Sequence, residues 1–258
     1  MDKKAMAKRL AAVCVATALL APGAPAADYY VANSGNNTNS GLSPATPWLL
    51  ISRALSQAAG GDTIHIADGD YPERIVVSNA VTLLGANLYF AGNPPFARGV
   101  SRTVIRPPDG APDSAVIMVN TNGVVVRGLT IDGDFDTNGL PDAKYGVYST
   151  NRPLVVDHCI ITNMAGYGIL NLGMVPPPAP DDTASVRGYF GYNTIVGITH
   201  TNAGAATGIF LDQAPATCEL NDIGWITGAT ARAGIYLHSC YYTSNMTPSL
   251  RVEASLLM

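Results

Sequence analysis

Hydrophobic positions along the chain recur in strand-sized segments. The segment 123–133 returns in modified form at 153–163 and again at 249–257. Aligning the copies gives three apolar columns: Val124, Leu154 and Leu250; Val126, Val156 and Val252; and Ile131, Ile161 and Leu257. Self-similarity at intervals of about 20 to 50 residues is the sequence signature of solenoids and propellers. The pattern therefore predicts a coil of stacked parallel strands.

A second set of strands begins with glycine. Its members are Gly146-Val147-Tyr148, Gly168-Ile169-Leu170, Gly208-Ile209-Phe210 and Gly234-Ile235-Tyr236. Since side chains alternate between the two faces of a strand, we expect each residue after the glycine to point inward. The next residues would form an outward column of Tyr148, Leu170, Phe210 and Tyr236, followed two positions later by Thr150, Leu172, Asp212 and His238. The two strand sets predict an all-β fold, which is a single-stranded parallel β-helix. We expect about six rungs, where a rung is one turn of the coil.

The first folded segment has a different pattern. A short strand at 29–31 precedes a helix predicted at 51–59, where apolar residues fall at helical spacing, and a strand follows at 63–67. The end of a solenoid exposes a hydrophobic cross-section that a terminal unit must cover. We therefore predict an N-terminal cap over about 28–62 within a β-helix domain spanning 28–258.

Several motifs of this segment carry a family resemblance. They are Tyr29-Tyr30-Val31, Gly60-Gly61-Asp62-Thr63-Ile64, Gly69-Asp70-Tyr71 and Val81-Thr82-Leu83-Leu84-Gly85. Over about 60 residues the run resembles the N-terminal cap and first rung of right-handed parallel β-helix proteins of the pectin-lyase-like superfamily. The later repeats resemble the same superfamily more loosely. The resemblance implies a right-handed coil and says more about fold than about chemistry.

Residues 1–27 have the pattern of a secretory signal peptide, with four basic residues, an apolar run at 10–21 and a small-residue cleavage pattern at 24–26. The apolar run is shorter than the roughly 20 residues that cross a bilayer, so no integral membrane segment is expected. The sequence thus predicts a secreted, periplasmic or cell-surface protein. Without this leader, 11 basic and 18 acidic residues remain, a net charge of −7. Because phosphate binding requires clustered basic residues, nucleic acid is excluded as a partner.

Three insertions interrupt the repeats, at 89–102, 132–145 and 174–182. The last contains four prolines, which cannot donate hydrogen bonds within a sheet. Inserted loops on one side of a solenoid are common places for binding sites. At the other end, Leu250–Leu257 repeats an interior strand with nothing after it. We expect either a truncated fragment or an open C-terminal rung that associates edge to edge with another molecule.

The insertion at 132–145 contains the motif D-x-D-x-N-G-x-x-D, which is similar to calcium-binding loops. Its candidate metal ligands are Asp134, Asp136, Asn138 and Asp142. A hard cation needs six or more oxygen ligands, and the glycine after Asn138 permits a sharp turn. Tyr145 stands where an EF-hand loop has its bidentate glutamate. The alternative is a solvated Asp/Asn/Gly-rich turn.

Three side chains are candidates for acid-base chemistry: Lys144, Asp212 and His238. Lys144 follows the acidic loop, and lysine or arginine is the base in the calcium-dependent polysaccharide lyases of the superfamily that the chain resembles. Asp212 and His238 are expected to be neighbours on successive rungs. A solvated loop lysine is the alternative for Lys144.

The outward column predicts a ligand class. Tyr148, Phe210 and Tyr236 would stack against sugar rings, with Arg232 nearby, so a polysaccharide is the expected partner. Packing of these rings against the core or a covering loop is the alternative. Two functions follow from these candidates: a calcium-assisted polysaccharide lyase, and a non-catalytic adhesin or carbohydrate-binding solenoid. We further expect Cys159 to be a buried thiol and His158 to share a corner column with Gly128, Asn193 and Asn221.

Overall fold

A computed structural model describes the chain at 25–86, 103–108, 114–134, 136, 141–150, 153–173, 188–200, 205–212, 216–219, 221–228 and 231–238. Most of the predicted leader lies outside these residues. So do the insertions at 89–102 and 174–182 and the strand copy at 249–257. The same holds for Asn138.

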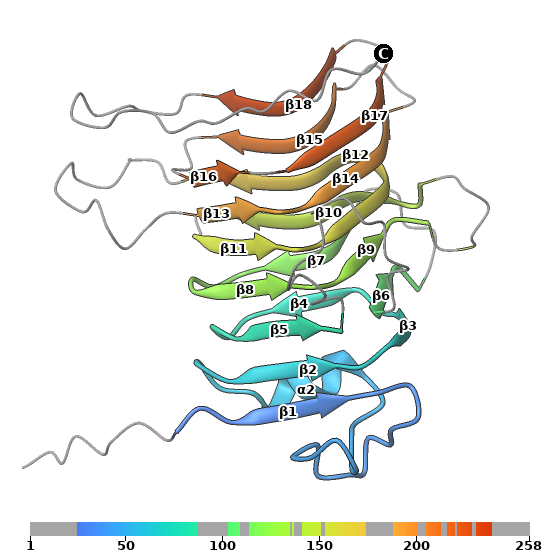
Figure 1. The fold of residues 1–258 in the computed structure, drawn as a ribbon, viewed down its shortest axis with the longest axis vertical. Coiled ribbons are helices and arrows are strands. Elements are labelled where there is room, and N and C mark those ends of the chain that lie inside the picture. The colour runs from blue at the N-terminus through green and yellow to red at the C-terminus, as the bar shows by residue number, and fades with distance from the viewer. Residues whose placement is uncertain are drawn as a thin grey trace, which may run out of the picture.

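Parallel strands stack along the long axis of a rod and form two sheets (Figure 1). The first sheet contains seven strands in the order β1 (Asp28–Val31), β2 (Thr63–Ile66), β5 (Thr82–Gly85), β8 (Val124–Arg127), β11 (Leu154–Asp157), β13 (Gly188–Gly191) and β16 (Ala216–Glu219). Every pairing within it is parallel.

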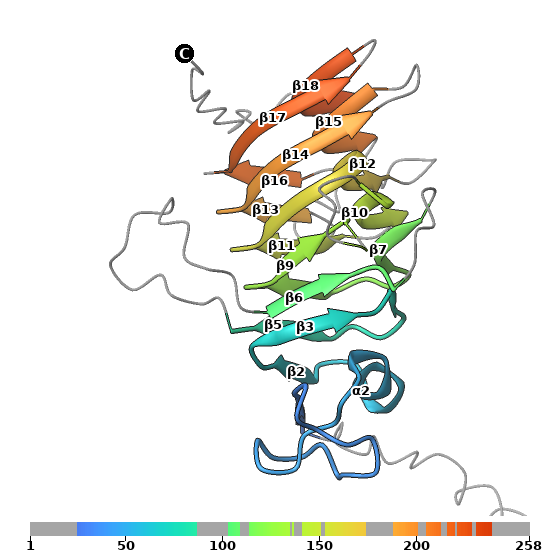
Figure 2. The same cartoon turned by 90° about the vertical axis from the view of Figure 1, so that its right-hand side faces the viewer.

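The second sheet bends into two runs of strands. The run visible at the front in Figure 2 contains β3 (Gly69–Pro72), β6 (Thr103–Arg106), β9 (Thr130–Asp132), β12 (Ile160–Leu172), β14 (Thr194–His200) and β17 (Asp222–Gly228). The other contains β4 (Ile75–Val77), β7 (Ala115–Val119), β10 (Ala143–Thr150), β15 (Ala205–Asp212) and β18 (Ala231–His238). The 13-residue strand β12 belongs to both runs. Six rungs therefore lie within the described residues, from β2–β4 to β16–β18, which confirms the predicted right-handed parallel β-helix.

The predicted columns are the ladders of the core. Leu154 pairs with Val124, Val156 with Val126, and Ile161 with Ile131. In the glycine-led strands, each apolar residue after the glycine pairs with its equivalent on the next rung, in the order Val147, Ile169, Ile209 and Ile235. The ladder residues of β8 to β12 are at most 2% exposed. Stacking like residues on like fills the interior because each rung repeats the shape of the one below it.

The glycines of the second strand set mark the closest approach between rungs. A Cβ atom on Gly146 would lie 2.6 Å from the carbonyl oxygen of Gly168. One on Gly168 would lie 2.7 Å from that of Gly208, and one on Gly208 would lie 2.7 Å from that of Gly234. We call Gly146, Gly168, Gly208 and Gly234 the glycine column. Only a residue without a side chain fits at the first three of these positions.

Asparagine side chains replace backbone hydrogen bonds at one corner of the coil. The buried Asn193 accepts the Cys159 amide at 3.0 Å and donates to the Val156 carbonyl at 2.9 Å. It also donates to Asn221 Oδ1 at 3.0 Å. The stacked column is therefore Cys159, Asn193 and Asn221. This satisfies buried backbone groups where the chain leaves the sheet.

The predicted corner column was correct in placing His158 with Gly128 and wrong by one residue in including Asn193 and Asn221. His158 has φ 53°, alongside Gly128 at 67° and Tyr192 at 56°. Its ring stacks on Tyr192 with centroids 4.9 Å apart. The left-handed corner column is therefore Gly128, His158 and Tyr192, preceding the asparagine column. The prediction for Cys159 is confirmed, since it is 1% exposed and burial raises the pKa of its thiol to about 12.

The predicted cap is present as helix α2 (Ile51–Gln57), which buries Ile51 and Ala54 against the first rung. No side chain at the residue before the helix caps it. Instead, the buried Glu73 between β3 and β4 accepts the amide protons of Ile51 at 2.7 Å and Ser52 at 2.9 Å. A carboxylate in this place satisfies two unpaired N–H groups and complements the positive end of the helix.

Candidate functional site

The acidic loop connects β9 to β10, and its two ends are tied together at Gly133. The carbonyl oxygen of Gly133 accepts the amide proton of Asp142 at 2.7 Å and that of Ala143 at 3.1 Å. The Gly133 amide donates to Thr162 on the next rung at 2.9 Å. The insertion therefore leaves the coil and returns to it at one point.

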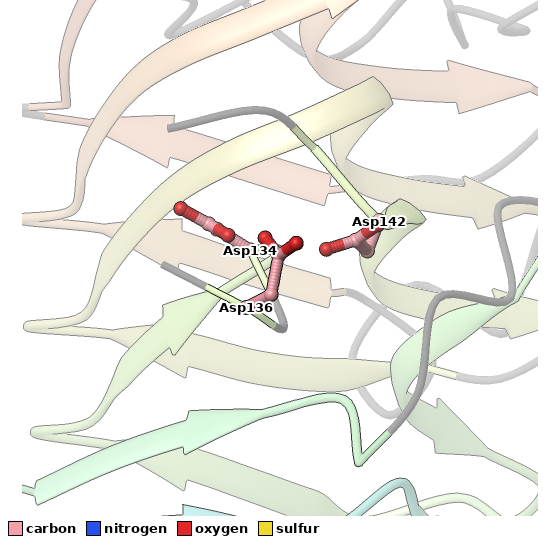
Figure 3. Close-up of side chains that lie close together, drawn as sticks. All are labelled: Asp134, Asp136 and Asp142. Atoms are coloured by element: carbon pink, nitrogen blue, oxygen red, sulfur yellow. The ribbon is translucent and has the colours of Figure 1, made fainter. Parts of the chain in front are cut away.

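Three of the four predicted metal ligands meet at this closure. One carboxylate oxygen each from Asp134, Asp136 and Asp142 lies within 4.8 Å of the others. Asp134 is buried, Asp142 is half-buried and Asp136 is exposed. Figure 3 shows Asp136 and Asp142 approaching each other from the two ends of the loop. Three hard oxygen donors at this separation are a donor set that suits Ca²⁺.

Asp132, the last residue of β9, supports the loop from below. Its Oδ1 accepts the Asp134 amide at 3.1 Å and the Asn163 side-chain amide at 2.9 Å. Its Oδ2 lies 3.8 Å from a guanidinium nitrogen of Arg106, which also binds Asp70 at 2.8 Å. Burial raises the pKa of Asp132, while the Asn163 hydrogen bond opposes the rise. Sequence reasoning missed Arg106 and Asn163, although the ladder places Arg106, Asp132 and Thr162 in one column.

The predicted outward column lies on the face of the second sheet formed by β10, β12, β15 and β18. Tyr148, Leu170, Phe210 and Tyr236 pair in register, as expected. Tyr148 and Phe210 are half-buried, and Tyr236 is 45% exposed. Leu170 is only 6% exposed, so side chains cover it.

Two further tyrosines complete this face, and the sequence interpretation missed both. Tyr145 stacks on Tyr167 with ring centroids 5.6 Å apart, and Tyr167 meets Phe210 edge-on at 5.5 Å. We call Tyr145, Tyr148, Tyr167, Phe210 and Tyr236 the aromatic layer. The signal was a Tyr-Gly pair at 145–146 repeated at 167–168. Reading each strand from its glycine onward excluded the residue before it.

Lys144 joins the acidic loop to the aromatic layer. It lies two residues after Asp142, and its Nζ is 5.4 Å from the centroid of the Tyr145 ring. Its backbone amide donates to Ser114 at 3.0 Å, which fixes the start of β10 against β7. The side-chain cation is therefore held over an aromatic face, which attracts it electrostatically.

The other candidates for acid-base chemistry lie at the opposite end of these strands. Asp212 pairs with His238 on the neighbouring rung, as the repeat predicts, and both share a row with Thr150 and Leu172. Lys144 and Thr150 are six positions apart on β10, a distance of about 20 Å along the strand. Lys144 and Asp212 therefore belong to different ends of the face. The backbone of Arg232 lies on β18 opposite Ala206, two rungs above β12.

No helix within the described parts of the chain is long and apolar enough to cross a membrane. Solved structures with a similar coil include a pectin methylesterase in complex with a hexasaccharide (16% identity, TM-score 0.45, covering 74% of this chain and 54% of that one). Another is the pectin methylesterase PemA from Erwinia chrysanthemi, with the same figures. A third is the Aspergillus niger pectin methylesterase (14% identity, TM-score 0.45, covering 84% and 68%).

The chain thus spans about half the length of the first structures that it matches. No curated protein sequence matches it significantly. The parallel β-helix that the family resemblance implied is confirmed by the strand pairings of the two sheets. A family profile matches residues 33–223, from the cap to the last described rung. The chain belongs to the family described as protein of unknown function (DUF1565).

Proposed function

We propose that this β-helix is an exported protein that binds polysaccharide on the face of its second sheet. The observation that carries the proposal is the meeting of two different sites at the start of β10. Asp142 completes the carboxylate cluster, Lys144 follows it, and Tyr145 begins the aromatic layer. A glycan lying along the rod would contact phenol, ammonium and carboxylate groups on adjacent rungs.

Calcium is the proposed cofactor of the acidic loop. Asp134, Asp136 and Asp142 would hold it, with Asn138 as the fourth side-chain ligand predicted from the motif. When bound, the ion would neutralise a uronate carboxylate of the glycan and make the neighbouring C5 proton more acidic. The net charge of −7 after residue 27 opposes the approach of an acidic glycan, and a bound cation would reduce this repulsion.

The catalytic version of the proposal is a polysaccharide lyase. Lys144, in its unprotonated form, would take the C5 proton. The electron pair of the C5–H bond would form the C4–C5 double bond, and the glycosidic oxygen at C4 would leave with its bonding pair and take up a proton. The second candidate is a non-catalytic adhesin. The observation that favours it is that Asp212 and His238 lie at the opposite end of the strands from Lys144, so the three candidates for acid-base chemistry do not form one site.

A single assay separates the two candidates. The protein is incubated with calcium and either polygalacturonate or alginate, and the ultraviolet absorbance of the unsaturated product is followed. A lyase raises the absorbance, and Lys144→Gln abolishes the rise even at glycan concentrations that saturate the variant. Binding without any absorbance change in the wild type establishes the adhesin and overturns the lyase. Failure to bind acidic or neutral glycans overturns the function as a whole.

Calcium is expected to raise the Tm of the wild-type protein. At a concentration one hundred times the Kd, a ligand stabilises the folded state by about 2.7 kcal/mol. For a chain of this size, that corresponds to a rise of about 5 to 10 °C. Asp136→Asn removes an exposed ligand and should abolish most of the rise. Thermal unfolding with calcium and with EDTA measures it.

The matched control is Asp68→Asn, which changes an exposed carboxylate in the turn between β2 and β3. This variant should keep the full calcium-dependent rise. An equal rise in Asp136→Asn and the wild type would rule out the acidic loop as the calcium site.

A further inference from the structure

Neighbouring rings in the aromatic layer are too close to admit a sugar. The rings of Phe210 and Tyr236 stack with centroids 5.1 Å apart and planes inclined by 21°. Those of Tyr145 and Tyr167 stack at 5.6 Å and 19°. Carbon atoms in contact lie 3.5 to 4.0 Å apart, so a third ring between two rings needs a separation of at least about 7 Å. The facing sides of these rings are therefore occupied by each other.

The direction of stacking determines which atoms the layer presents. Tyr145 and Tyr167 are paired residues on successive rungs, as are Phe210 and Tyr236. The two stacked pairs are turned against each other, because the planes of Tyr167 and Phe210 meet at 84°. Within each pair the rings cover one face of each other, and the end of the ring farthest from the backbone is left for contact with a ligand. On an outward-pointing tyrosine, the outermost atom is then the phenol oxygen. Tyr145 and Tyr167 consequently present hydroxyl groups, whereas Phe210 presents only a hydrocarbon edge.

Lys144 adds a positive charge to this edge. Its Nζ lies 5.4 Å from the Tyr145 ring centroid. Burial raises the pKa of Tyr167, with Tyr145 adding to the rise and Lys144 opposing it. The Tyr167 phenol is thus protonated at neutral pH and donates one hydrogen bond, while the lysine ammonium donates three. The two groups together form a set of donors at the start of β10 and on its partner β12, and Lys144 lies two residues after Asp142 of the acidic loop.

We propose, on the basis of the polysaccharide-binding function above, that Tyr145, Tyr167 and Lys144 form a row of hydrogen-bond donors that recognises acceptor oxygens of the glycan. The ring faces serve the fold, by stacking the rungs on one another. The ligand class is therefore a glycan with accessible acceptor oxygens along the chain and an anionic one opposite Lys144. Insertion of a sugar ring between neighbouring aromatic rings is not the mode of this surface.

The experiment compares tyrosine-to-phenylalanine variants, which keep the stacked rings and remove only the hydroxyls. Binding of calcium-saturated oligogalacturonate and of neutral cellohexaose is measured by isothermal titration calorimetry. Tyr145→Phe and Tyr167→Phe should each weaken binding of the acidic probe about three- to tenfold, the effect of one lost hydrogen bond. Tyr30→Phe is the matched control, because the Tyr30 ring stacks on His65 at 4.9 Å on the other sheet. The affinity of this variant for the acidic probe should equal that of the wild type.

Phe210→Leu tests the structural role of the rings. Its Tm should fall because two ring contacts are lost, while its affinity stays within about twofold of the wild type. If the Tyr145→Phe/Tyr167→Phe double variant binds the acidic probe as tightly as the wild type, the donor row is overturned and the polysaccharide function stands. If the wild type binds neither probe, both are overturned.

Discussion

Replacing Gly168 with alanine is expected to lower the Tm by about 6 to 12 °C, the equivalent of about 3 kcal/mol in a chain of this length. The added Cβ would lie 2.7 Å from the Gly208 carbonyl oxygen and 2.7 Å from Cγ2 of Ile195. One contact is backbone of the next rung and the other is core. Neither can move away without spreading the rungs, because the strand pairing on both sides fixes their spacing.

The matched control is Gly224→Ala in β17, where a Cβ would meet no atom within 4 Å. This variant should unfold within about 1 °C of the wild type, as expected for a substitution without steric consequence. Thermal unfolding followed by circular dichroism compares the two. An equal loss in both variants would contradict close approach between rungs as the reason for the glycine column.

Replacing Asn193 with alanine should destabilise the fold by about 3 to 5 kcal/mol, since several buried groups lose their partners at once. The Cys159 amide has Asn193 Oδ1 as its acceptor, and the Asn193 side chain also bonds to Val156 and Asn221. Water cannot replace these bonds because Asn193 is 1% exposed. Hydrogen exchange measured by NMR should show lost protection of the Cys159 amide, along with a lower unfolding free energy in urea.

Asn120→Ala serves as the comparison, because Asn120 is exposed at the end of β7. Its effect should stay within about 0.5 kcal/mol of zero. Unchanged protection of the Cys159 amide in Asn193→Ala would contradict the role assigned to the asparagine corner.

Repetition explains how much of the fold could be predicted from the sequence. Val124, Leu154 and their partners occupy equivalent places on successive rungs, so alignment of the chain with itself predicts which residues touch. The glycine column was visible for the same reason. The error in the corner column arose because glycine and asparagine are both common at corners, although Gly128 and Asn193 have different roles there. Gly128 accommodates a positive φ. Asn193 lies one position later in its own rung, and its side chain bonds to backbone groups.

The candidate site was less predictable because its geometry depends on contacts across rungs. The D-x-D-x-N-G spacing correctly indicated that Asp134, Asp136 and Asp142 gather, since a short closed loop leaves them little choice. Whether neighbouring rings stack face to face depends on side-chain rotamers, which periodicity does not determine. Asp132 likewise contacts Arg106 on the preceding rung and Asn163 on the following rung, so this part of the site depends on residues from three rungs.

The closure of the acidic loop at Gly133 allows the loop to differ without a change in the rod. Strand pairing is present on both sides of the insertion, with Asp132 opposite Thr162 before it and Ala143 opposite Met164 after it, and the register shifts between Ala143 and Tyr145. Both returning amides bond to the same carbonyl oxygen, so the insertion can change length or composition without shifting the rungs above and below. The loop can therefore be replaced as a unit, and we expect that loops of different specificity can be exchanged at this junction.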